Sequence, residues 1–281
     1  MAHRHVATTQ LASERANRGT SNLTIAGIPP DVLAVTWAQL TLIIGARYFV
    51  VAGVFYALLW LRPEAKVGAT RLAERRPTRA SVFYEIRASL AASTIYALPG
   101  AIVLEAWKRG GTAIYDTISG PLDVLYMPMS LLLYLAAHDA YFYWTHRLMH
   151  TPALFRATHL THHRTRQPPP WAAFCFHPWE AAISAWLLPA MAVVVPIHVY
   201  TVAALLVVMT YCGVANHAGW EVLPRRFLRT GLGRQLITAS HHNVHHTNYS
   251  ANFGLYFRFW DRLCGTDRGI AAPARGGGKY S

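Results

Sequence analysis

Histidines gather in three short segments of this chain, and their spacing could bring them to one metal centre. The first segment holds His146 and His150. The other two hold three histidines each: His159, His162 and His163, and then His242, His245 and His246. Residues three and four apart share one face of a helix, so each segment presents its imidazoles together. Neutral imidazole binds iron, zinc, copper and nickel. Eight such groups exceed the needs of one ion, which predicts a pair of ions.

The segments lack the residues that several other chemistries need. No glutamate lies between the histidines, as it does in the HExxH helix of zinc hydrolases, and we find no catalytic serine elbow or phosphate-binding glycine loop. What remains is a redox-capable iron pair that activates dioxygen and attacks an unactivated C–H bond. Two alternatives stay open: a metal-binding membrane protein without catalysis, and a zinc-dependent membrane hydrolase. A transporter would distribute ionisable residues through several spans, whereas here they gather near one end.

The composition indicates an integral membrane protein. Hydrophobic residues make up 53% of the chain and charged residues only 14%, which is unusual for soluble domains. The net charge of +13 comes from basic residues that flank apolar runs, so membrane topology explains it better than a nucleic acid partner does. The three cysteines, Cys175, Cys212 and Cys264, are scattered singly. They form neither a zinc motif nor a disulfide framework.

Several apolar segments are long enough to cross a bilayer, for which roughly 20 residues suffice. They cover residues 37–61, 88–107 and 122–143. Residues 181–220 contain no charged side chain and are broken by two prolines, which predicts a helical hairpin or a re-entrant pair. The sequence therefore predicts an all-α, integral membrane helical bundle of about four to five spans or re-entrant helices, with a histidine-rich helical cap.

The chain is expected to consist of one domain with a tail at each end. Residues 1–30 are polar and mixed, with no resemblance to a cleavable signal peptide, and are predicted to be a disordered tail. Residues 31–268 are predicted to form a single membrane-embedded domain, and residues 269–281 a flexible tail.

Charge distribution predicts which side of the membrane carries the cap. The loop after the first span is strongly basic, with Arg62, Lys66, Arg71, Arg75, Arg76 and Arg79. By the positive-inside rule this loop is cytoplasmic. The third span and the hairpin both return to that side, so all the histidine segments are expected there. Arg47 interrupts the first span. A charge at such a position snorkels, faces the bundle interior or marks a functional site.

The histidine segments and their surroundings resemble the three-box signature of the fatty acid hydroxylase/sterol desaturase superfamily. The accompanying motifs are Asp139–Thr145 (DAYFYWT), His177–Glu180 (HPWE), Asn216–Gly219 (NHAG), Asn252–Gly254 (NFG) and Phe259–Arg262 (FWDR). The resemblance covers roughly residues 85–268. It implies membrane enzymes with a di-metal centre, iron when active although zinc can replace it on purification. Such enzymes use dioxygen to hydroxylate or desaturate fatty acyl, sterol, sphingoid or carotenoid-type lipids.

The resemblance also implies roles for individual residues. It makes the eight histidines metal ligands, adds His217 as a ninth, and marks His177 as a further candidate. His138, His198 and His241 are not expected to be ligands. Asp139 lies one heptad before His146 and nearly on the same helix face. It is expected either to orient a ligand imidazole from outside the metal or to form an ion pair with Arg147.

The electrons must come from elsewhere. The chain shows no haem-binding, flavin-binding or ferredoxin-type cysteine pattern. A separate donor of the cytochrome b5 or ferredoxin type is therefore expected, and the basic cytoplasmic face could dock it if it is acidic.

Overall fold

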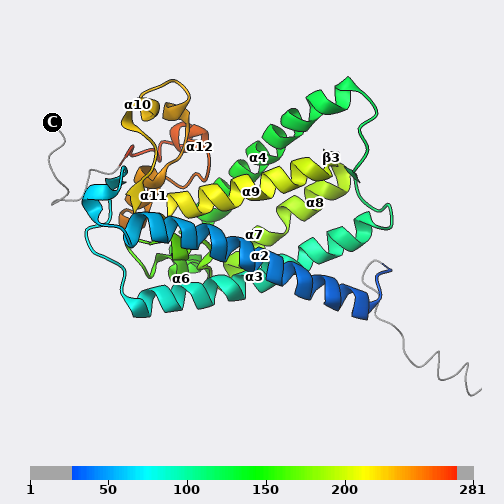
Figure 1. Cartoon of the computed structure of the whole chain (residues 1–281), viewed down its shortest axis with the longest axis horizontal. Helices are drawn as coiled ribbons and strands as arrows, with labels where there is room; N and C mark the ends of the chain where they lie inside the picture. The colour runs from blue at the N-terminus through cyan, green and yellow to red at the C-terminus, as the bar shows by residue number, and fades with distance from the viewer. Residues whose placement is uncertain (1–26, 271–281) are drawn as a thin grey trace, which may run out of the picture.

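The computed structural model describes residues 27–270 and is almost entirely helical. The predicted tails, 1–30 and 269–281, lie outside the described residues except for 27–30 and 269–270. Four long helices form the bundle: α2 (Pro30–Trp60), α3 (Arg79–Trp107), α4 (Pro121–Met149) and α9 (Val199–Asn216) (Figure 1). Of these, α2, α3 and α9 are long and apolar enough to cross a membrane. The predicted all-α membrane bundle is confirmed, and the chain is an integral membrane protein.

Local signals at the helix starts explain why the helices exceed the predicted apolar segments. Proline at the first position of α2 and α4 is pre-organised for a helix and lacks an N–H that would go unused there. The Thr78 side chain accepts a hydrogen bond from the Ser81 N–H at the start of α3, as N-cap residues do. These capping residues lie outside the apolar segments from which the helices were predicted, so the predicted helices start too late. At its other end α4 continues to Met149 and therefore carries His146 on its last turns.

The predicted hairpin is present. Its first arm is the pair α7 (Pro178–Ala185) and α8 (Leu187–Val194), and its second arm is α9. Between them β3 (Ile197–His198) pairs in parallel with β2 (Ile114–Tyr115), with Ile197 opposite Ile114. The His198 side chain accepts from the N–H of Tyr200 and caps α9. His198 thus lies at the turn of the hairpin, as expected.

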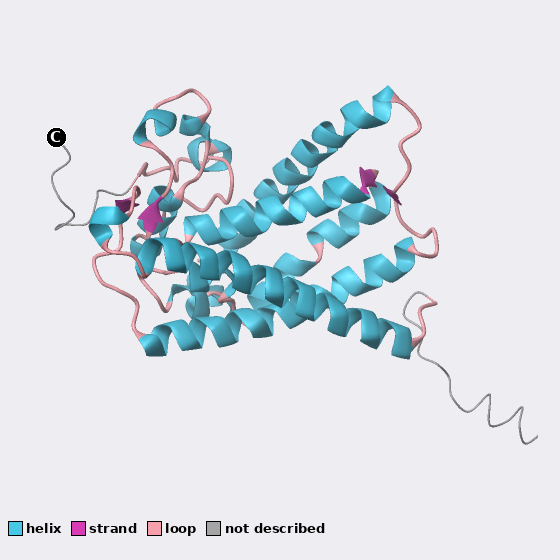
Figure 2. Ribbon diagram, viewed as in Figure 1, coloured by secondary structure: helices cyan, strands magenta, loops and turns pink. Residues whose placement is uncertain are grey.

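The cap covers the end of the bundle where α2, α4 and α9 finish (Figure 2). It consists of short elements: η1 (Glu64–Lys66), β1 (Thr70–Arg71), α5 (Pro152–Thr158), α6 (Leu160–His163), η2 (Pro170–Phe174), β4 (Trp220–Glu221), α10 (Arg225–Leu228), η3 (Gly233–Gln235), α11 (Ala239–Thr247) and α12 (Phe259–Leu263). β1 pairs antiparallel with β4, with Thr70 opposite Glu221. This pairing ties the basic loop to the cap.

A tight turn joins α9 to β4. Trp60 donates its indole N–H to the Ala218 carbonyl at 2.9 Å, and its ring meets Trp220 edge to face at 6.0 Å. Gly219 has a φ of 70°, a left-handed conformation that costs little only for glycine. A Cβ there would also lie 2.6 Å from the Trp60 ring. The turn directly follows His217, so its geometry positions that imidazole.

We predict that Gly219→Ala destabilises the fold by about 1–3 kcal/mol, because alanine is strained at positive φ and its methyl group meets Trp60. Thermal unfolding of the detergent-solubilised protein measures the effect as a lower Tm. Gly68→Ala is the matched control, because a Cβ at Gly68 meets nothing within 4 Å. Equal Tm values for the two variants would contradict the prediction.

Candidate metal centre

Nine imidazoles converge in two groups at the cap. The five-histidine group comprises His146, His150, His159, His163 and His245. The four-histidine group comprises His162, His217, His242 and His246. Within each group the candidate ligand atoms all lie within 4.8 Å of one another. The structure thus brings together all three histidine segments and His217.

The two groups adjoin because short helices contribute to both. In α6, the neighbours His162 and His163 point into different groups. In α11, His242 and His246 enter the four-histidine group while His245 enters the other. The rings of His163 and His246, one from each group, have centroids 4.6 Å apart. Two ions bound in these groups would therefore be immediate neighbours.

Backbone carbonyl oxygens determine which nitrogen carries the hydrogen in three of the imidazoles. Nδ1 of His146 donates to the Phe253 carbonyl at 2.9 Å, and Nδ1 of His245 donates to the Ala251 carbonyl at 2.8 Å. Nδ1 of His217 likewise donates to the carbonyl of Gly213, one turn earlier in α9. A carbonyl can only accept, and a neutral imidazole has a single N–H. The inner Nε2 atoms of these three rings therefore present lone pairs.

The inner nitrogens face one another at short range. Nε2 of His163 lies 3.1 Å from that of His150 and 3.0 Å from that of His245. Nε2 of His242 lies 2.8 Å from that of His217 and 3.1 Å from that of His246. So many converging nitrogen donors are the ligand set of a transition-metal ion. The residues present fit one ion in each group.

Burial keeps these imidazoles in the form that binds metal. Burial, together with the charge that neighbouring imidazoles would carry, holds the pKa of His242 and of His246 well below the ordinary value. Both rings are therefore neutral at pH 7, and metal binding requires neutral imidazole.

A buried carboxylate supports one ring from behind. Oε1 of Glu180, at the start of α7, lies 2.8 Å from Nδ1 of His159, and the two side chains are only 2% and 1% exposed. Carboxylates that contact the outer nitrogen of a ligand histidine fix its orientation and raise its basicity. Sequence reasoning missed this residue, although Glu180 belongs to the His177–Glu180 motif. The available signal was that Glu180 is the single acidic residue between Asp139 and Glu221.

Asp139 does not take the role expected of it. Its carboxylate accepts hydrogen bonds from the backbone N–H groups of residues 255–257, at 2.8 to 3.3 Å. Among the described residues it contacts neither an imidazole nor Arg147, whose guanidinium instead donates to the Tyr143 hydroxyl. The Asp261 carboxylate likewise accepts from the N–H groups of Phe253 and Gly254. These two acids hold the loop whose carbonyls receive the imidazole N–H groups.

The other histidines within residues 27–270 lie outside both groups. His177 begins α7, where its Nδ1 accepts from the Trp179 N–H at 3.3 Å, so the structure does not bring this candidate to the other ligands. Nδ1 of His138 lies 2.9 Å from the Tyr256 hydroxyl. His241 accepts from the Thr238 N–H and closes the start of α11.

Aromatic rings line the two groups. Phe253 contacts His146, His150 and His245, with ring centroids 5.2 to 5.7 Å apart. Phe176 packs on His162 at 5.2 Å. Tyr249 contacts His163 at 4.5 Å and is 38% exposed. Apolar rings therefore pack against both groups, and of these three Phe253 is buried and Tyr249 is exposed.

Sequence comparisons identify the family of this region. Residues 131–266, which include both histidine groups, match the fatty acid hydroxylase family. A lathosterol oxidase from Rattus norvegicus is 31% identical over 160 residues, which cover 56% of this chain and 52% of that protein. A Delta(7)-sterol 5(6)-desaturase from Aspergillus fumigatus is 30% identical over 195 residues, which cover 68% of this chain and 54% of that protein. No solved structure matches significantly.

Residues 131–266 therefore belong to the fatty acid hydroxylase family, and the resemblance to the fatty acid hydroxylase/sterol desaturase superfamily seen in the histidine boxes is confirmed. The chain spans about half the length of the curated relatives it matches.

We predict that Glu180→Gln weakens metal binding about 10- to 100-fold, as loss of a carboxylate behind a ligand histidine commonly does, and that Glu180→Ala weakens it further. Metal retained after dialysis against graded chelator measures the effect. The exposed Glu74→Gln is the matched control. Unchanged retention in Glu180→Gln, at an unchanged Tm, would rule out the orienting role.

We also predict that His163→Ala and His242→Ala each lower the metal content from about two ions per chain towards one, because each removes the central ring of one group. Elemental analysis of purified protein measures the content. His177→Ala should retain both ions, since His177 belongs to neither group. A loss of metal in His177→Ala equal to that in His163→Ala would contradict this division.

Proposed function

We propose that this chain is a membrane-bound non-haem di-iron oxygenase that hydroxylates or desaturates a lipid C–H bond with dioxygen and external electrons. One observation carries the proposal: nine imidazoles, eight of them buried and that of His150 half-buried, converge in two adjoining groups where a membrane bundle ends. Membership of the lipid hydroxylase/desaturase superfamily supports it.

We propose that His146, His150, His159, His163 and His245 hold one iron ion, and that His162, His217, His242 and His246 hold the other. Zinc would occupy the same ligands in protein purified without iron. Iron bound there would supply the reductive activation of dioxygen and the oxidation of an unactivated C–H bond.

The chain's own residues prepare the site for that chemistry. Backbone carbonyls accept from the outer nitrogens of His146, His217 and His245, and the Glu180 carboxylate lies beside that of His159, so the inner nitrogens of these four rings stay directed at the centre. The protein's part in such enzymes is binding, orientation and the exclusion of competing reactions. Rings such as Phe253 and Phe176 serve the last purpose by limiting water.

The proposed substrate is a fatty acyl, sterol, sphingoid or carotenoid-type lipid. The matched relatives are named for sterols, as lathosterol oxidase and Delta(7)-sterol 5(6)-desaturase, and this favours a sterol among the four classes. Hydroxylation and desaturation begin with the same hydrogen abstraction, so both products belong to the proposal.

We place the metal centre on the cytoplasmic side, with electrons delivered by a separate cytochrome b5- or ferredoxin-type protein. The basic loop supports this orientation, because β1 within it pairs with β4 of the cap and positive loops favour the cytoplasm.

The geometry favours the oxygenase over the two alternatives. A non-catalytic metal carrier would need ligands along a path, whereas the nine rings gather at one end. A zinc hydrolase needs a carboxylate base beside the metal-bound water. In the described part of the chain, Glu180 is the carboxylate that lies within ion-pair distance of a histidine in either group. It contacts Nδ1 of His159, whereas Nε2 of His159 faces Nε2 of His146 inside the group.

The test is expression in a lipid-producing host that supplies sterols, followed by mass spectrometry of extracted lipids. We expect products that gain one oxygen or lose two hydrogens, and none with His163→Ala. Oxygen consumption by the iron-loaded protein with a reductant and a lipid panel is the second measurement. Iron-loaded protein that consumes no oxygen with any lipid class would contradict the proposal, and lipid hydrolysis by zinc-loaded protein would favour the hydrolase.

A further inference from the structure

A buried tyrosine, Tyr143, lies beside the five-histidine group. It is one helical turn before His146 in α4, and its side chain is fully buried. The Phe253 ring contacts both residues, with its centroid 6.1 Å from that of Tyr143 and 5.7 Å from that of His146. A single aromatic ring therefore connects the phenol to a proposed ligand imidazole.

The Tyr143 hydroxyl begins a chain of hydrogen bonds that ends at a carboxylate. Its oxygen lies 3.0 Å from Oγ1 of Thr266, which in turn lies 2.7 Å from Oδ1 of Asp261. An ionised carboxylate only accepts, so the single hydroxyl hydrogen of Thr266 is directed to Asp261, and Thr266 accepts from Tyr143. The Tyr143 oxygen also accepts from the Arg147 guanidinium at 3.2 Å. A proton leaving Tyr143 thus has a continuous path to Asp261.

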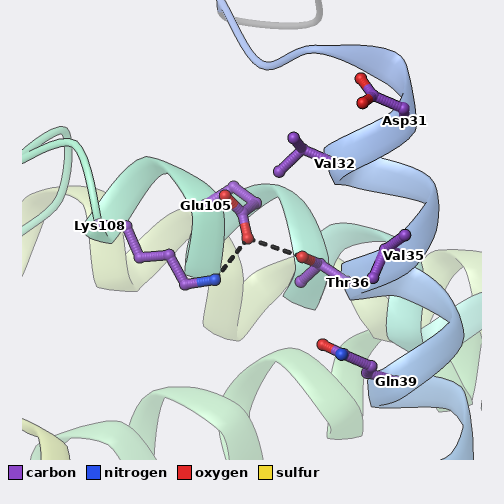
Figure 3. Close-up of a pocket in the computed structure, with 7 residues that line it drawn as sticks. All are labelled: Asp31, Val32, Val35, Thr36, Gln39, Glu105 and Lys108. Carbon is purple, nitrogen blue, oxygen red and sulfur yellow. Dashed lines mark hydrogen bonds and ion pairs between the residues drawn. The ribbon is translucent and has the colours of Figure 1, made fainter.

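Asp261 is buried without a cation to hold it ionised. In the described part of the chain it forms no ion pair, and it accepts from Thr266 and from two backbone N–H groups. Glu105 differs, because it pairs with Lys108 at 2.7 Å, and Figure 3 shows its carboxylate directed to Lys108 and Thr36. Burial raises the pKa of the Asp261 carboxyl. This carboxylate therefore accepts a proton more readily than an exposed one.

Two indoles connect Tyr143 to the surface. The Tyr143 ring stacks on that of Trp260 at 6.1 Å and meets that of Trp144 edge to face at 5.3 Å, and the two indoles are 5.8 Å apart. Trp144 is 49% exposed and follows the apolar segment 122–143. Tyrosine and tryptophan can each lose one electron to a strong oxidant, and rings in near contact exchange electrons rapidly. Tyr143 therefore has a path for an electron as well as one for a proton.

We propose that Tyr143 is a one-electron redox residue of the metal centre, which protects the ligand histidines when no lipid is bound. The inference rests on the proposed function, which supplies the oxidant, iron that has reacted with dioxygen. Tyr143 gives one electron to this iron, its proton passes to Thr266, and the proton of Thr266 passes to the Asp261 carboxylate. The neutral tyrosyl radical then regains one electron, through Trp260 and Trp144, from a one-electron reductant at the surface, and the protons return. Oxidising equivalents thus leave the centre without oxidising an imidazole.

Two other tyrosines provide the comparison. Tyr134, on the same helix, is also buried, but its hydroxyl donates to the Val195 carbonyl at 2.8 Å. A carbonyl does not retain a proton at neutral pH, so Tyr134→Phe is the matched control. Tyr249 contacts the proposed ligand His163 at 4.5 Å and is the rival site of oxidation.

The first experiment uses full-length protein loaded with zinc, which does not change its oxidation state. A ruthenium tris-bipyridine label is attached at Leu148→Cys, an exposed position four residues after Trp144. The labelled chain also carries Cys212→Ser and Cys264→Ser, while the remaining cysteine is buried. A laser flash with an external electron acceptor turns the label into a one-electron oxidant. We expect transient absorption and EPR to show a tyrosyl radical.

Substitutions assign the radical and its proton path. Tyr143→Phe should abolish the radical and Tyr134→Phe should retain it. Thr266→Val should slow its formation about tenfold, the equivalent of one lost hydrogen bond, and should reduce the effect of D₂O on the rate. Zinc content and Tm equal to those of the parent protein show that each variant folds.

Three results of this experiment would overturn the proposal. The parent protein, which needs no variant at these positions, gives no tyrosyl radical; the radical persists in Tyr143→Phe; or it is lost in Tyr249→Phe instead. Because zinc replaces iron here, these results do not depend on the oxygenase assignment.

Iron-loaded protein provides the second readout. With dioxygen and a reductant but no lipid, we expect the tyrosyl EPR signal in wild-type protein, and more oxidised ligand histidine in Tyr143→Phe by mass spectrometry. Protein that oxidises lipid but gives no tyrosyl signal in its absence would also overturn the proposal. Failure of the oxygenase assignment is recognised separately, as iron-loaded protein that consumes no oxygen with any lipid.

Discussion

An imidazole can bind a metal ion only through a nitrogen that carries no hydrogen, and the cap is built around that requirement. Nδ1 of His146, His245 and His217 each donates outward to a backbone carbonyl. These contacts decide which nitrogen of each ring is available inside. The carbonyls of Ala251 and Phe253 belong to one loop, so the position of that loop matters as much as that of the histidines.

That loop is held by charges that never touch the centre. Asp139 reaches it from α4 and Asp261 from α12. Both carboxylates accept backbone N–H groups that would otherwise be buried without partners, which is costly. The chain of support thus runs from helix to carboxylate, to loop carbonyl, to imidazole. Bundle and cap consequently act as one unit around the histidines.

Much of this arrangement could be predicted from the sequence because it depends on local periodicity. Helical spacing placed His242 and His246 on one face, and hydropathy located the long helices. What periodicity cannot give is the register between elements distant in the chain. It could not show that His162 and His163, adjacent in sequence, enter different groups. For the same reason it favoured Asp139, close to a ligand along its own helix, over Glu180, which reaches His159 from a different helix.

The end of α9 has a consequence for how lipids would reach the centre. This helix has 18 residues, about 27 Å at the usual rise, which nearly equals the hydrocarbon thickness of a bilayer of about 30 Å. His217 follows its last residue directly, without a linker. The hydrophobic length of α9 therefore sets the distance of the metal centre from the membrane midplane. A thicker or thinner membrane would shift which carbon of an embedded molecule lies level with the imidazoles.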